Sequence, residues 1–212
     1  TGMVYTREEL EALAAVCEKH GLYVLSDDIY YKLVYDGLEY TSIASVSPAM
    51  KEQCIVINGV SKTYAMTGWR VGYALANPTV AKAMSSYVSH STGAPATMAQ
   101  WAALEALEGD QGSVEEMRQQ FEKRRDHLVE RMNKIEGVSC IKPEGAFYLF
   151  PRTLEADDRA FCERAKKYDL LLVPGSDFGA PGHMRISYCV KTETVEKALP
   201  LFKKLAEEYK IR

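Results

Sequence analysis

The sequence predicts an α/β fold followed by a smaller α+β part, and three observations lead to this. Short apolar runs of strand length alternate with segments whose apolar residues recur at helical spacing. The apolar runs lack polar alternation, which is typical of a mostly parallel sheet covered on both faces. Charged residues make up 26% of the 212 residues and hydrophobic ones 47%. This composition is globular and excludes a disordered or fibrous chain.

The first half of the chain begins with a helix start signal. Thr6 and Glu9 form a capping-box pattern, apolar residues follow at helical spacing, and Gly21 ends the helix. Beyond it we expect strands at 22–26, 54–58 and 71–76, and helices at 78–90 and 95–108.

The second half begins after a polar, glycine-containing break at 109–112. A long amphipathic pattern from 114 to about 135 predicts a helix that Gly137 stops. We then expect strands at 146–150, 171–173 and 184–188, and helices at 157–168 and 192–209. We place one domain at 1–112 and a small α+β domain at 113–212.

Several classes of function are disfavoured by composition and spacing. The net charge of −3 gives no electrostatic reason to expect nucleic acid, and no apolar stretch reaches the length of a membrane span. The four histidines form no metal-binding motif, so we expect no metal. The first residues do not resemble a signal peptide. The five cysteines form no CxxC pair, which favours reduced thiols and a cytoplasmic protein.

The segment from Ser61 to Gly72 carries the strongest chemical signal, because it follows an apolar strand and is rich in Gly, Thr and Ser. A lysine that leaves a strand end into a tight loop is poorly solvated, which favours a neutral amine. Such an amine can form a Schiff base with a carbonyl, which makes Lys62 a candidate catalytic residue. Arg70 offers a planar fork for a phosphate. From these residues alone, a surface lysine and arginine in a loop remain the alternative.

The pattern Ser-Lys-x₆-Gly-Trp-Arg-x-Gly resembles the pyridoxal-phosphate attachment motif of class I/II aminotransferases, the fold type I superfamily of aspartate aminotransferase. The resemblance implies that Lys62 attaches the cofactor and that Arg70 holds its phosphate. Some family members have a phosphate-binding serine where this chain has Gly59. We expect Ser61 to supply that contact instead.

Three further matches follow the family's order along the chain. The segment 26–30 resembles its Asp-Glu-x-Tyr segment, which implies that Asp27 pairs with the protonated ring nitrogen and that Tyr30 bonds the ring oxygen. The segment 143–151 resembles a strand of its small domain, in which Phe147 lines the pocket or packs in the core. The segments 173–179 and 184–188 resemble the loop and strand that close the site, and Arg185 matches the arginine that binds the substrate carboxylate.

The resemblance implies part of the three-layer large domain of a pyridoxal-phosphate transferase, and the activity of an aminotransferase. Substrates would be an L-amino acid and a 2-oxo acid, Lys62 would act as general base, and the protein would be a homodimer. Thr1-Gly2 matches the end of the family's Asn-Pro-Thr-Gly turn. We therefore expect a C-terminal fragment of an enzyme about twice as long, inactive by itself.

Two other functions share these motifs. A pyridoxal-phosphate-dependent carbon–sulfur lyase would carry the same residues, and some transcription regulators contain an aminotransferase-like domain without catalysis. The amino-acid substrate is not predicted, because aspartate, aromatic and alanine enzymes of the family share the carboxylate arginine.

Overall fold

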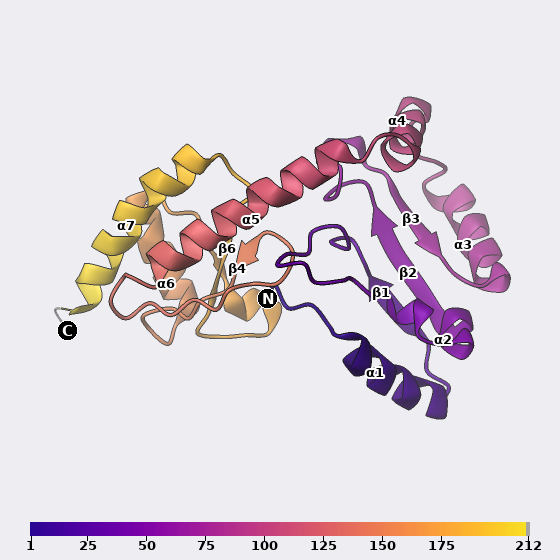
Figure 1. Cartoon of the computed structure of the whole chain (residues 1–212), viewed down its shortest axis with the longest axis horizontal. Helices are drawn as coiled ribbons and strands as arrows, with labels where there is room; N and C mark the ends of the chain where they lie inside the picture. Colours follow the sequence, from indigo (N-terminus) through magenta and orange to yellow (C-terminus); the bar gives the residue numbers. More distant parts are fainter. Residues whose placement is uncertain (211–212) are drawn as a thin grey trace. The chain divides into compact units, whose positions relative to one another are not determined.

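The computed structural model describes residues 1–210 and contains two compact units (Figure 1). The first unit is Val4–Glu116, and the second begins at Met117 and includes Thr1–Met3. The change from one unit to the other falls within a single helix, α5 (Gly112–Met132). The expected domain boundary at 112 stays a prediction.

The first unit contains a three-stranded sheet in the order β1-β2-β3. Its strands are β1 (Val24–Asp27), β2 (Cys54–Gly59) and β3 (Gly72–Leu75). β1 runs parallel to β2 with Asp27 opposite Ile57, whereas β3 runs antiparallel to β2 with Gly72 opposite Gly59. The sheet is therefore mixed, and its only parallel pair joins the two strands that precede the predicted site residues.

Capping residues mark the starts of helices in the first unit. They are α1 (Arg7–Lys19), α2 (Pro48–Gln53), α3 (Pro78–Ser91) and α4 (Thr97–Glu108), with short 3₁₀ turns η1 (Ile43–Ser45) and η2 (Thr67–Trp69). The predicted capping box is present: the Thr6 N–H donates to the Glu9 carboxylate at 2.8 Å, and the Glu9 N–H donates to the Thr6 hydroxyl at 3.2 Å. α2 was not predicted, although Ser47 caps it and Pro48 occupies its first turn.

Helices pack on one face of this sheet and leave the other face largely exposed. Helices α1 and α2 pack on one face, where Leu10 and Met50 meet Cys54 and Val56 in a buried cluster. Successive strand residues point to opposite faces, so Leu25 belongs to the other face, and it is 73% exposed. The expectation of a sheet covered on both faces is wrong for this chain, because α1 and α2 bury only one of them.

The second unit is a small α+β structure. Its antiparallel sheet has the order β4-β6-β5, with β4 (Tyr148–Leu149), β5 (Val173–Pro174) and β6 (Met184–Ser187). Its other elements are α6 (Asp158–Ala165), α7 (Thr192–Lys210), and the 3₁₀ turns η3 (Lys166–Tyr168) and η4 (Gly175–Phe178). The predicted α/β class and the smaller α+β part are confirmed, and the strands of the second unit are shorter than expected. Within the described residues, no helix combines the length and hydrophobicity needed to cross a membrane.

Candidate functional site

The carboxyl ends of β1 and β2 bring two predicted site segments to one edge of the sheet. Asp27 is the last residue of β1, and Lys62 follows the end of β2 at Gly59 by three residues. Neighbouring parallel strands end at the same edge, which in open α/β sheets is the usual place for a ligand. The predicted cofactor residues all belong to the first unit: Asp27, Tyr30, Ser61, Lys62 and Arg70.

Asp27 presents an exposed carboxylate on the uncovered face of the sheet. Its Oδ1 accepts a 3.3 Å hydrogen bond from the Ile29 N–H, which fixes the turn after β1. Tyr30, half-buried, follows in that turn, and its carbonyl accepts from the Leu33 N–H at 2.7 Å. The carboxylate therefore has an ordered backbone and an open face toward a ligand.

The loop after β2 holds two non-glycine residues in the left-handed region. Ala65 has φ 53° and Arg70 has φ 54°. Such conformations are costly for L-residues, and they concentrate at functional sites where the surrounding structure enforces them. The Arg70 side chain is exposed and its Nη1 donates to the Thr67 carbonyl at 3.0 Å. Ser61 and Lys62 are half-buried in the same loop.

Gly59 and Thr63 show how tightly the base of this loop is packed. A Cβ on Gly59 would lie 2.9 Å from the Val71 carbonyl oxygen and 3.2 Å from the Gly72 Cα, so a serine there would force the backbones apart. Thr63 is fully buried, and its hydroxyl has no hydrogen-bond partner among the described residues. Close packing of backbone explains why glycine stands at 59.

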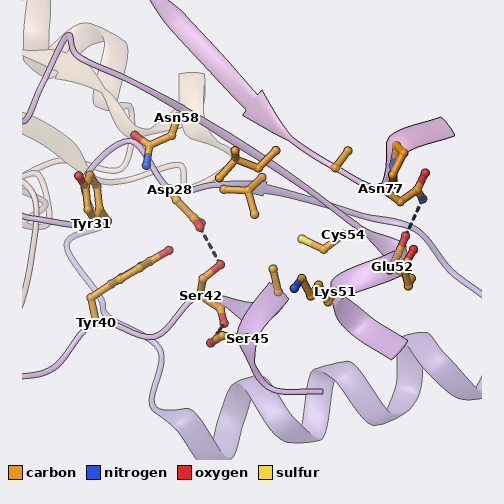
Figure 2. A pocket seen from close by; sticks show the side chains of 15 residues that line it. Asp28, Tyr31, Tyr40, Ser42, Ser45, Lys51, Glu52, Cys54, Asn58 and Asn77 are labelled. Carbon is orange, nitrogen blue, oxygen red and sulfur yellow. Dashed lines mark hydrogen bonds between the residues drawn. The ribbon is translucent and has the colours of Figure 1, made fainter. Parts of the chain in front are cut away.

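Asp28 is a buried carboxylate that the sequence did not single out as a site residue. One oxygen accepts from the Ser26 hydroxyl at 2.6 Å. The other accepts from the Ser42 hydroxyl at 2.9 Å (Figure 2). Burial and a hydrogen bond with Asp28 raise the pKa of Tyr40 above its ordinary range. Asp27 is exposed whereas Asp28 is buried. The alternation of side chains along a strand could have predicted this, because it turns neighbouring residues to opposite faces of the sheet.

A cavity of about 590 Å³ lies beside Asp28 on the helix-covered face. Figure 2 shows Asp28, Tyr40 and Ser42 on one side of it and Glu52 and Asn77 on the other. The Asn77 Nδ2 donates to the Glu52 carbonyl at 2.8 Å. None of the predicted cofactor residues lines this cavity, so it is separate from them.

Arg185, the predicted substrate residue, lies on β6 of the second unit. It is half-buried, and its guanidinium carbon lies 4.4 Å from the ring centroid of Tyr148 and 4.2 Å from that of Phe178. These distances are within cation–π range. Within the described part of the chain, no carboxylate pairs with Arg185.

Phe147 packs in the core of the second unit. It is 7% exposed, and its ring contacts Phe121 at 5.6 Å and Tyr148 at 4.7 Å between centroids. The N–H groups of Glu144 and Gly145, just before it, both donate to the Gly2 carbonyl, at 2.8 and 2.9 Å. Of the two expectations for Phe147, the structure favours core packing.

The described residues contain no group of three or more His, Cys, Asp or Glu side chains that could hold a metal. The predicted cofactor residues carry an exposed carboxylate, a phenol, a primary amine and a guanidinium. Such a set can hold an anionic, ring-containing cofactor.

Comparison with known proteins identifies relatives over nearly the whole chain. The profile of the family described as "Aminotransferase class I and II" matches residues 1–201. The chain is 46% identical to an aspartate aminotransferase of Geobacillus stearothermophilus, over 94% of this chain and 53% of that protein. It is 44% identical to an asparagine–oxo-acid transaminase of Streptococcus mutans, with the same two coverages.

Solved structures give the same result for the fold. An aspartate aminotransferase from Thermotoga maritima superposes with a TM-score of 0.90 at 43% identity, over 98% of this chain and 54% of that one. An aromatic aminotransferase from Pyrococcus horikoshii gives 0.94 at 37% identity, over 100% and 58%. The chain thus spans about half the length of the relatives it matches.

Proposed function

Because the chain belongs to the class I and II aminotransferase family, we propose that the protein moves an amino group between an L-amino acid and a 2-oxo acid, with pyridoxal 5'-phosphate as cofactor. The observation that carries the proposal is the position of Asp27 and of the Lys62 loop. Both follow neighbouring parallel strands at one edge of the sheet. The family relatives include enzymes named for aspartate and for asparagine.

The donor set of the first unit fits this cofactor. A carboxylate suits a protonated ring nitrogen, a phenol suits the ring oxygen, an amine suits the aldehyde, and a guanidinium suits the phosphate. Asp27, Tyr30, Lys62 and Arg70 supply these four groups in turn, and Ser61 adds a hydroxyl for the phosphate. The Asp27 and Arg70 side chains are both exposed, which leaves them accessible to such a ligand.

The cofactor, when bound, supplies an electron sink for the charge that develops at the substrate α-carbon. Asp27 keeps the ring nitrogen protonated, because a nearby carboxylate favours the charged form of that nitrogen. Tyr30 donates to the ring oxygen and stabilises its negative charge.

Lys62 and Arg185 act on the substrate in this proposal. The Lys62 amine would hold the cofactor, and, once the substrate amino group has displaced it, the freed amine would move a proton at the substrate α-carbon as a general base. Arg185 binds the α-carboxylate through two parallel N–H donors, a geometry that a lysine does not provide.

We also propose a homodimer. Its support in this chain is a set of large apolar side chains on α3 and α4 that lie open: Tyr87 is 75% exposed, Met98 78% and Trp101 66%. Large apolar side chains that lie open in this way are common at protein–protein contacts.

Amino transfer itself tests the proposal. The protein is supplied with pyridoxal phosphate, an L-amino acid (aspartate first) and a 2-oxo acid, and both products are quantified, together with pyruvate to detect carbon–sulfur lyase activity. Lys62→Ala should abolish transfer, whereas Lys51→Ala, which changes an exposed lysine on α2, should not. Measurable transfer that is equal in the wild type and in Lys62→Ala would refute the role of Lys62.

A further inference from the structure

Two aromatic rings, rather than an acid, contact the guanidinium of Arg185. Its central carbon lies over the rings of Tyr148 and Phe178 at 4.4 and 4.2 Å from their centroids. Among the described residues, no carboxylate pairs with it and no hydrogen bond involves its N–H groups. A half-buried arginine normally offsets its desolvation with hydrogen-bonded partners. The N–H groups of the Arg185 guanidinium are therefore available to a ligand.

The rings and the donors of an arginine do not compete with each other. A guanidinium is planar, so an aromatic ring stacks on its face while its five N–H groups point outward in the plane. Contact with Tyr148 and Phe178 therefore restricts the orientation of that plane and leaves its edge available. A planar carboxylate binds along such an edge through two parallel hydrogen bonds.

Phe178 is held in place although much of its own surface is open. It is 47% exposed, so burial in a core does not explain its position. It ends the turn η4, and its ring meets Phe150 edge-on at 6.2 Å between centroids. The same turn is tied to α6 by the buried Asp158 carboxylate, which accepts from the Ser176 N–H at 2.7 Å and from its hydroxyl at 2.8 Å.

We propose that Phe178 and Tyr148 are positioning residues, which set the plane of the Arg185 guanidinium so that it receives a carboxylate edge-on. The inference rests on the proposed function, in which Arg185 binds the α-carboxylate of the substrate. It adds that the affinity of this site depends on two rings that themselves make no hydrogen bond to the carboxylate.

The test observes Arg185 directly by NMR of its Nε–Hε group, assigned by loss of the signal in Arg185→Lys. Succinate is titrated into the wild-type chain and into Phe178→Leu, Tyr148→Leu, Phe178→Tyr and Tyr148→Phe. Two quantities are read: the ring-current shift of the signal without succinate, and the apparent Kd for succinate. Leucine at 178 is structurally mild because the Phe178 side chain is 47% exposed and lies outside the buried core.

The leucine variants should move the free signal downfield and weaken succinate binding about fivefold each, which is the size expected for one partly desolvated cation–π contact. The conservative variants, which keep a ring, should bind within about twofold of the wild type. Leucine variants that bind as tightly as the wild type would overturn the inference, and so would a wild-type signal that succinate does not move.

The proposed function fails in a different measurement. Attachment of the cofactor is read at Lys62, in the other unit and without succinate. Suppose that pyridoxal phosphate attaches to Lys62, but the leucine variants bind succinate as tightly as the variants that keep a ring. The proposed function would then stand, and this inference would be refuted.

Discussion

Asp27 and Asp28 are adjacent in the sequence and have opposite surroundings. Asp27 is exposed and, among the described residues, accepts only a weak backbone hydrogen bond, at 3.3 Å. Asp28 is 9% exposed and accepts from two serine hydroxyls. One carboxylate is therefore available to a ligand, whereas the other joins the end of β1 to the segment that contains Ser42.

This difference predicts opposite effects of the same substitution. Asp27→Asn should weaken binding of pyridoxal phosphate about tenfold or more, because a charged hydrogen bond contributes about 1.5–3 kcal/mol, and should leave the melting temperature unchanged. Asp28→Asn, the matched control, should lower stability by about 1–2 kcal/mol, since an amide must replace a buried acceptor. Fluorescence titration and thermal unfolding measure the two effects. An Asp27→Asn protein with wild-type cofactor affinity would rule out the ring-nitrogen role.

At the scale of elements, the turn η4 and the segment up to β6 depend on two glycines. A Cβ on Gly175 would lie 2.3 Å from the Ala180 carbonyl oxygen and 2.8 Å from the His183 Cβ. Gly179, the residue directly after this turn, has φ +73°, and a Cβ there would meet no atom within 4 Å. The two glycines are therefore required for different reasons: close packing at 175 and backbone conformation at 179.

Alanine at these two positions should separate the two reasons. Gly175→Ala should cost about 3 kcal/mol or more, because two backbone segments must move apart. Gly179→Ala should cost about 1–2 kcal/mol, the penalty of a left-handed conformation for an L-residue. Urea unfolding of both variants gives these values. Equal costs would contradict the close packing at Gly175.

The contact between α6 and η4 predicts a dependence of stability on pH. Burial by itself would raise the pKa of the Asp158 carboxyl, but hydrogen bonds from the Ser176 hydroxyl and N–H and from the Gly182 backbone outweigh it and hold that pKa below its ordinary value. A carboxyl whose pKa is depressed by folding stabilises the fold above its unfolded pKa of about 3.9, and this is lost as pH falls through the folded value.

Asp158→Asn should therefore lower the urea midpoint at pH 7, and the difference from the wild type should shrink as the pH falls below about 4. Asp169→Asn, at an exposed left-handed position that asparagine tolerates, is the control and should follow the wild type at every pH. A pH-independent difference for Asp158→Asn would show that its charge is not what stabilises the contact.

At the scale of the whole molecule, the exposed apolar side chains on α3 and α4 predict self-association. Sedimentation velocity of the chain at micromolar concentrations should show dimers or larger species, and the double substitution Met98→Lys with Trp101→Lys should shift them toward monomer. Leu171→Lys, which changes an equally exposed leucine of the second unit, should not. A wild-type chain that sediments as a monomer would contradict this.

Local signals predicted most of the elements, because caps and glycines act over a few residues. The capping box at Thr6 and the stop at Gly21 are examples, and both lie at the observed ends of α1. The short helix α2 escaped prediction since six residues are too few to show a helical period. The exposure of one face of the sheet was not predicted either. The sequence of an apolar strand such as β1 does not indicate which of its faces the rest of the chain covers.

Local motifs predict candidate site residues, whereas the contacts around those residues could not be predicted from the sequence. The motif around Lys62 and the strand end at Asp27 are local in sequence, and the parallel pairing of β1 and β2 places them at one edge. The Tyr148 ring over Arg185 and the Ser42 hydroxyl at Asp28 come from residues distant in the chain. Such contacts depend on tertiary packing, which no spacing rule encodes.

The most direct test of the proposed cofactor site is covalent trapping. The chain is incubated with pyridoxal phosphate, reduced with borohydride, digested, and mapped by mass spectrometry. A single adduct on Lys62 is the predicted result, because this lysine follows the strand that neighbours Asp27. No adduct, or adducts scattered over several lysines such as Lys51 and Lys82, would contradict the assignment of Lys62 as the residue that holds the cofactor.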